Sequence, residues 1–222
     1  MENIELPLLW NGPEDARTIL ILAHGAGAPM DSPFMDYFAE NLAAQGIRVL
    51  RFEFSYMAER RVTGKKRPPE RAEKLLAAWR QVIDSLARDR DIYIGGKSMG
   101  GRMASLIADE MTAAGRISGL ICLGYPFYAA GRQDRPRTEH LMGMTTRALI
   151  VQGDRDAMGN RETVTGYDLS PAIRVSWADD GNHDLVPRKR SGFTQEANWQ
   201  QAIQNILQFI TQAKGAESDD KL

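Results

Sequence analysis

The sequence predicts an α/β domain with a mainly parallel central sheet. Short apolar runs rich in β-branched residues recur along the 222-residue chain, and helical patterns separate several of them. The runs are nearly continuous in apolar character, which is typical of strands covered on both faces. Strands that alternate with helices indicate parallel pairing. The predicted strands span residues 18–23, 47–52, 91–96, 119–124, 147–153 and 172–178.

Four segments show the apolar periodicity of helices. The first covers residues 33–46, where Gly46 supplies a C-terminal stop. Others begin at Glu70, just after Ser98 and near the C-terminus. Their apolar stripes comprise Leu75, Leu76, Trp79, Val82, Ile83 and Leu86; Met103, Leu106, Ile107 and Met111; and Trp199, Ile203, Ile206, Leu207 and Ile210. We expect one domain over residues 1–214 and a flexible acidic tail over 215–222.

Composition excludes several classes of protein. A net charge of −1 provides no overall field for nucleic acid or an anionic membrane. The N-terminus lacks the features of a signal peptide, and no apolar stretch approaches the ~18 residues that span a bilayer. The single cysteine, Cys122, excludes an intrachain disulfide, and the three scattered histidines lack metal-ligand spacing. We therefore expect a cytoplasmic protein with no metal or other cofactor and with no nucleic-acid or membrane partner; a protein partner is not indicated.

The stretch IYIGGKSMGGR (92–102) contains two overlapping motifs. GKS resembles the end of a phosphate-binding P-loop, but the position where that loop needs its first glycine holds Asp91. GKSMG fits G-x-S-x-G, a strand–turn–helix element that exposes a nucleophilic serine. An apolar run leads into Gly96 and a helical pattern follows Ser98. This context favours the serine turn over nucleotide binding.

A nucleophilic serine needs a base and an acid, which follow it in this order in hydrolases built on the motif. His183 follows the last predicted strand and is preferred as the base to His24, which precedes the serine, and to His140. Asp156 is preferred as the acid to Asp154, because it lies farther from the strand end. The weaker candidates for the acid are Asp179 and Asp180.

An oxyanion intermediate requires hydrogen-bond donors. The main-chain N–H of Met99, directly after the serine, is one candidate. The small residues in ILAHGAG offer a second, the N–H of Ala26, with Gly25 as the neighbouring alternative. His24 is then expected to hold the shape of this loop.

The motifs HGAG, GKSMGG, GDRD and GNH, in this order, resemble the α/β-hydrolase fold. The runs LILAHGAGAPMDSPFM, VLRFEFSYM, GGKSMGGRMAS, LGYPF, RTEHL and LIVQGDRDAMG are similar to the small dienelactone-hydrolase-like proteins related to the testis-expressed and NSL-complex-subunit proteins. The resemblance implies helices on both faces of the sheet and a triad of Ser98, Asp156 and His183. Dienelactone hydrolases use a cysteine nucleophile, so their particular reaction is not implied.

The remaining loops bear on the substrate. The loop from Gly124 to Thr146 is short and mainly polar, which predicts a minimal cap and small soluble esters or thioesters. The basic run 59–67 either attracts an anionic substrate or is a solvated loop. Seven side chains either line a pocket or anchor loops: Phe34, Met35, Phe54, Tyr56, Tyr125, Phe127 and Tyr128. The chain is thus predicted to be a serine hydrolase; the alternative is a non-catalytic protein-interaction module that retains the fold.

Overall fold

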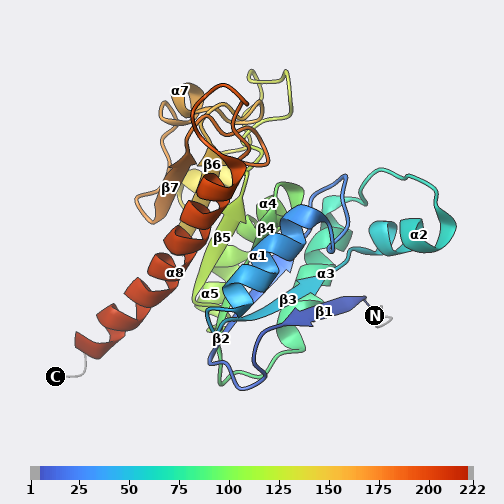
Figure 1. The fold of residues 1–222 in the computed structure, drawn as a ribbon. Coiled ribbons are helices and arrows are strands. Elements are labelled where there is room, and N and C mark those ends of the chain that lie inside the picture. Colours follow the sequence, from blue (N-terminus) through green and yellow to red (C-terminus); the bar gives the residue numbers. More distant parts are fainter. Residues whose placement is uncertain (1–5, 220–222) are drawn as a thin grey trace. The chain divides into compact units, whose positions relative to one another are not determined.

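The computed structural model describes residues 6–219 (Figure 1). The chain divides into two compact units between Leu120 and Ile121. The single domain expected over residues 1–214 stays a prediction. In the part of the chain that the structure describes, no helix is both long enough and apolar enough to cross a membrane.

Four strands lie side by side in the first unit (Figure 1). The pairs β2–β3 and β2–β4 are parallel, and β1 pairs antiparallel with β3. Their bounds are β1 (Leu8–Asn11), β2 (Thr18–Ala23), β3 (Arg48–Phe52) and β4 (Asp91–Lys97). Every residue of β2 is buried, as expected of a strand covered on both faces. Strand β1 was not expected, because its apolar run is only three residues long and the strand is partly exposed, not covered on both faces.

In the first unit, each strand except β1 is followed by one or two helices. They are α1 (Pro33–Ala43), α2 (Ser55–Thr63), α3 (Ala72–Asp84), α4 (Met99–Ser105) and α5 (Ala108–Ala113). Pro33 begins α1, where its missing N–H costs no hydrogen bond. Helix α2 was expected to be a loop, since it buries only Tyr56 and Met57 and has no long apolar stripe. The apolar stripe after Ser98 belongs to two short helices, α4 and α5, and not to one.

The second unit contains the parallel pair β6–β7 and the long C-terminal helix α8. Strand β5 (Gly119–Leu123) spans the boundary between the units. The other elements are β6 (Ala148–Gly153), β7 (Ile173–Ala178), α6 (Glu139–Met142), α7 (Arg161–Val164) and α8 (Gln195–Asp219). Helix α8 includes residues 215–219, and residues 220–222 lie outside the described residues, so the flexibility expected of the tail 215–222 stays a prediction. No proline interrupts this segment, so the helix can extend through Gly215.

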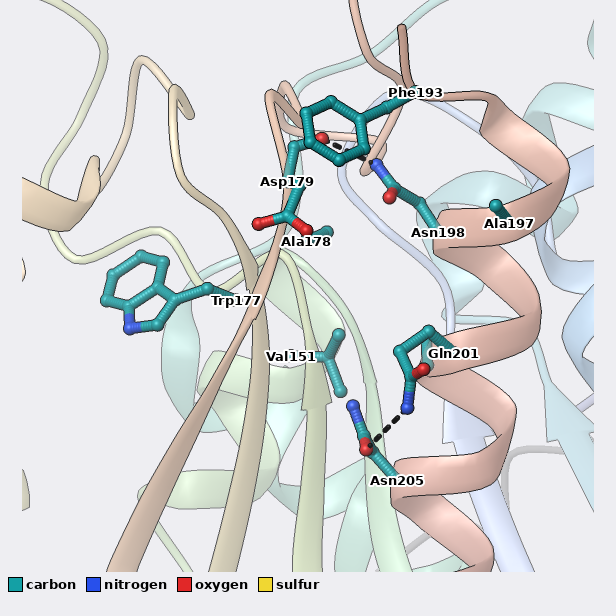
Figure 2. Close-up of a pocket in the computed structure, with 10 residues that line it drawn as sticks. Val151, Trp177, Ala178, Asp179, Phe193, Ala197, Asn198, Gln201 and Asn205 are labelled. Atoms are coloured by element: carbon teal, nitrogen blue, oxygen red, sulfur yellow. Dashed lines mark hydrogen bonds between the residues drawn. The ribbon is translucent and has the colours of Figure 1, made fainter.

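A pocket of about 170 Å³ lies in the second unit between α8 and the β6–β7 pair (Figure 2). Its carboxamides bond within the protein: Gln201 Nε2 donates to Asn205 Oδ1 (3.2 Å), and Asn198 Nδ2 donates to the Asp179 carbonyl (2.9 Å). None of the predicted triad residues lines it. The lining residues are Val151, Trp177, Ala178, Asp179, Phe193, Ala197, Asn198, Gln201, Ala202 and Asn205.

Candidate active site

Ser98 lies in a strained turn between β4 and α4. Its φ of 52° and ψ of −115° place a non-glycine residue in a conformation that L-amino acids rarely adopt. The two motif glycines face the same part of β2: a Cβ on Gly96 would lie 2.1 Å from the Ala23 carbonyl oxygen, and one on Gly100 would lie 2.3 Å from it. Glycine is therefore required at both positions, because any side chain would collide with the backbone of β2. The strand–turn–helix context inferred from the sequence is present.

The loop after β2 lies against this turn. A Cβ on Gly25 would lie 3.7 Å from Ser98 Cβ, at ordinary van der Waals distance, so the two residues are neighbours in space. The neighbouring His24 is fully buried, and burial lowers its pKa. Its Nε2 accepts a hydrogen bond from the Phe54 N–H (3.1 Å), so the neutral ring carries its proton on Nδ1, which donates to the Gly25 carbonyl (2.7 Å). Both ring nitrogens are thus occupied in holding the loop.

Two side chains of helix α2 fix the orientation of the loop after β2 by donating hydrogen bonds to the carbonyl oxygens of that loop. Tyr56 Oη donates to the Ala26 carbonyl (3.0 Å), and Arg60 donates to the Gly27 carbonyl (3.1 Å). The Gly25 carbonyl faces His24, and a trans peptide directs its N–H opposite to its C=O. The N–H of Ala26 belongs to that peptide, so it points away from His24.

A buried carboxylate attaches α2 to the segment that follows this loop. Glu53 is fully buried and accepts hydrogen bonds from the Met30 N–H (3.2 Å) and from two nitrogens of Arg61 (2.5 and 2.8 Å). Arg61 also donates to both oxygens of Asp31, which lowers the pKa of that carboxyl. The bond to Glu53, followed by that to Asp31, raises the pKa of Arg61, so the guanidinium stays charged.

Replacing Arg61 with methionine is expected to destabilise the protein by about 2–3 kcal/mol, because Glu53 is left buried and without its countercharge. The value is set below that of a fully buried pair, since the Arg61 side chain is 39% exposed. Arg67→Met is the matched control: Arg67 pairs with Glu59 on the surface, and its loss should cost less than about 1 kcal/mol. Urea unfolding of both variants measures the difference; equal midpoints would contradict it.

In the second unit, Asp156 and His183 form a hydrogen-bonded pair. His183 Nδ1 lies 2.7 Å from Asp156 Oδ2. The Asp156 side chain is fully buried, whereas that of His183 is 25% exposed. Asp156 Oδ1 accepts from the Met158 N–H (2.8 Å), so both carboxylate oxygens are occupied. In the neutral imidazole, an Nδ1–H that donates to the carboxylate leaves Nε2 as the acceptor nitrogen, and this tautomer can accept a proton.

The loop that bears His183 is cross-linked on both sides. Asp180 forms ion pairs with Arg155 (2.7 Å) and Arg188 (2.5 Å). The hydrogen bond from Arg188 lowers the pKa of Asp180 to about 2, so this carboxylate stays charged at neutral pH. Asn198 of α8 donates to the carbonyls of Asp179 and Leu185 (both 2.9 Å), which lie on either side of the histidine.

The other candidates from the sequence have different surroundings. Asp154 makes no contact with His183 among the interactions that the described residues show, and its buried Oδ1 has no hydrogen-bond partner there. Asp179 pairs with Arg161 at 3.9 Å, and His140 Nε2 lies 3.2 Å from Tyr125 Oη. The seven pocket candidates are each at most 9% exposed, which is typical of residues that anchor loops: Phe34, Met35, Phe54, Tyr56, Tyr125, Phe127 and Tyr128.

Sequence reasoning missed two residues that support the site. Gln152, the penultimate residue of β6, is fully buried and bonds to Asp156. Arg61 was assigned to a basic run, yet it neutralises Glu53. A signal existed for Gln152, because a polar residue at the end of an apolar strand must find hydrogen-bond partners once it is buried. For Arg61 there was none, since α2 itself was not predicted.

Comparisons with known proteins identify the family and the fold of the chain. The model of a family described as "Alpha/beta hydrolase domain" matches residues 16–211. The structure is similar to Est1E from Butyrivibrio proteoclasticus, with a TM-score of 0.69 and 17% identity over 95% of this chain and 97% of that one. It is also similar to a dienelactone hydrolase from Anabaena variabilis, with a TM-score of 0.67 and 19% identity over 90% of this chain and 91% of that one. A third similar structure is XC6422 from Xanthomonas campestris, a serine hydrolase without a lid, with a TM-score of 0.57 and 21% identity over 81% of each chain. The relation to testis-expressed and NSL-complex-subunit proteins stays a prediction.

Proposed function

Because the chain belongs to the α/β-hydrolase family, we propose that it is a serine hydrolase of small soluble esters or thioesters. The single observation that carries the proposal is the hydrogen bond between His183 Nδ1 and the buried Asp156. A surface histidine needs no buried carboxylate partner, whereas a general base does. The strained φ of Ser98 supports the same conclusion, since backbone strain is concentrated at functional sites.

In the proposed reaction Ser98 Oγ attacks the carbonyl carbon of the substrate. His183 Nε2 accepts the hydroxyl proton, and Asp156 stabilises the imidazolium that forms. The proton then passes to the leaving group, the acyl group remains on Ser98, and water releases it with His183 again as the base. The N–H groups of Met99 and Ala26 donate to the oxyanion of each tetrahedral intermediate.

His24 is unsuited to the role of the base. Both of its nitrogens are engaged with the backbone, and protonation would require the Nε2 bond from Phe54 to break inside the core. We assign it the positioning role expected from the sequence: it orients the Gly25 carbonyl and, through that peptide, the Ala26 N–H.

The size of the substrate is inferred from the loop between β5 and β6. Within residues 124–147 the only helix is the four-residue α6, so this loop supplies no large cap of the kind that shelters lipid chains. The fold is also similar to that of a serine hydrolase without a lid. We therefore propose short acyl chains and water-soluble leaving groups.

Treatment with a fluorophosphonate, read by intact mass, tests the proposal. The wild-type protein should gain one adduct, Ser98→Ala should gain none, and His183→Ala should react slowly because the serine has lost its base. Hydrolysis of a series of p-nitrophenyl esters of increasing chain length then measures the acyl preference. A folded wild-type protein that gains no adduct and hydrolyses no ester would contradict the proposal and favour the interaction module.

A further inference from the structure

We infer that Gln152 is a positioning residue of the proposed hydrolase, one that holds Asp156 in the orientation in which it receives the His183 N–H. The kinetic effect that we expect rests on the proposed function, whereas the hydrogen bonds of Gln152 do not depend on it. Gln152 Nε2 lies 2.8 Å from Asp156 Oδ2, the same oxygen that His183 Nδ1 contacts at 2.7 Å. One carboxylate oxygen thus receives the histidine and the amide together.

The surroundings of Gln152 fix the direction of its amide. Nε2 is within hydrogen-bond distance of three oxygens: Asp156 Oδ2, the Gly159 carbonyl (3.0 Å) and the Tyr125 carbonyl (3.1 Å). Oε1 accepts from the Tyr125 N–H (2.6 Å). Turning the amide over would set its oxygen against three other oxygens and its NH₂ against an N–H. The structure therefore permits only the orientation that donates to Asp156.

Close packing keeps this amide in place. Gln152 is fully buried, and Gly159 approaches it without a side chain: a Cβ there would lie 2.5 Å from a ring carbon of Phe127 and 3.1 Å from Gln152 Nε2. A buried amide with all its groups paired has little freedom to move. Asp156 is then held from two directions, by Gln152 at Oδ2 and by the Met158 N–H at Oδ1.

The hydrogen bonds from Gln152 and from the Met158 N–H fix the plane of the Asp156 carboxylate. The remaining lone pair of Oδ2 then faces His183. Without Gln152 the carboxylate could rotate about its Cβ–Cγ bond, and the imidazole would follow it away from the orientation that the proposed reaction requires. Misplacement of a catalytic group by about 1 Å can cost on the order of 100-fold in rate. Because Gln152 acts on the base and not on the bound substrate, its loss should appear in kcat and not in KM.

The test compares Gln152→Met with Asn160→Ala as a matched control. Methionine is similar in length to glutamine but makes none of the four hydrogen bonds of the Gln152 amide. Asn160 follows Asp156 in the segment between β6 and α7, and its Oδ1 accepts a hydrogen bond from the Thr163 N–H at the start of α7. It has no bond to Asp156 among the interactions of the described residues. We expect Gln152→Met to lower kcat on a p-nitrophenyl ester by about 10–100-fold with KM within about threefold, and Asn160→Ala to change kcat less than about threefold.

Proton NMR supplies a readout that does not depend on activity. The Nδ1–H of His183, bonded to a buried carboxylate, should give a far-downfield resonance, assigned by its absence in His183→Ala. This resonance should shift or broaden in Gln152→Met and stay in place in Asn160→Ala. If the wild-type protein forms no fluorophosphonate adduct, the proposed function fails while the resonance still reports the positioning of His183.

A second variant keeps the inference testable if Gln152→Met does not fold. Gln152→Asn retains the amide but shortens the side chain by one methylene, which withdraws the NH₂ from Asp156, so a loss of kcat and a change in the resonance are again expected. A folded Gln152→Met or Gln152→Asn with kcat within about twofold of wild type and an unchanged resonance would overturn the inference.

Discussion

Replacing Ser98 with alanine is expected to lower ester turnover by roughly 10⁴-fold or more. The loss is large because the hydroxyl is the proposed nucleophile, and the base has no proton to take without it. The strained turn, with Gly96 and Gly100 against Ala23, should remain, since alanine adds no atoms to the site. Circular dichroism should therefore match the wild-type spectrum, and steady-state hydrolysis of a p-nitrophenyl ester measures the loss.

Ser105→Ala is the control for Ser98→Ala. Ser105 lies at the last position of α4 and donates to the Arg102 carbonyl (2.8 Å) within its own helix. Activity within about threefold of wild type is expected, because this hydroxyl has no role in the proposed chemistry. If Ser98→Ala retained most of the activity, or if both variants lost it equally, Ser98 could not be the nucleophile.

The strand pattern could be predicted from the sequence because burial on both faces leaves a direct trace. The run TILILA predicts a strand over the same residues that form β2. Strand β1 and helix α2 were missed for one reason: LLWN and SYMAERRVT bury few side chains, so tertiary contacts and not periodicity decide their structure. In α2 those contacts are made largely by Arg61 and Tyr56, whose partners lie in other segments.

The candidate site divides in a similar way. Residue types and chain order were enough to nominate Ser98, Asp156 and His183, because the motif fixes a local turn and its partners follow in a set order. The preference for Asp156 over Asp154 depended on loop geometry, and it is Asp156 that contacts His183. The position of Gln152 at the end of an apolar strand signals that it needs hydrogen-bond partners, but the sequence does not name them, because hydrogen bonds between side chains that converge in space leave no periodic pattern.

Replacing Asp156 with asparagine is expected to lower kcat by about 10³–10⁴-fold, because the amide cannot satisfy all of its neighbours. Three N–H groups point at this carboxylate, from Gln152, Met158 and His183. If the new NH₂ takes the place of Oδ2, it faces the NH₂ of Gln152, and His183 must accept at Nδ1. The imidazole then carries its proton on Nε2 and can no longer act as a base. If the amide turns over, its NH₂ opposes the Met158 N–H.

Asp154→Asn separates this explanation from a general loss of acidic residues in the loop. Asp154 lies two positions earlier, and no contact to His183 is seen for it among the described residues, so kcat should stay within about threefold of wild type. The far-downfield resonance of His183 should disappear or shift in Asp156→Asn and persist in Asp154→Asn. The reverse pattern would make Asp154 the acid. Equal and small effects in both variants would mean that His183 works without a carboxylate partner, which its 2.7 Å contact with a buried aspartate argues against.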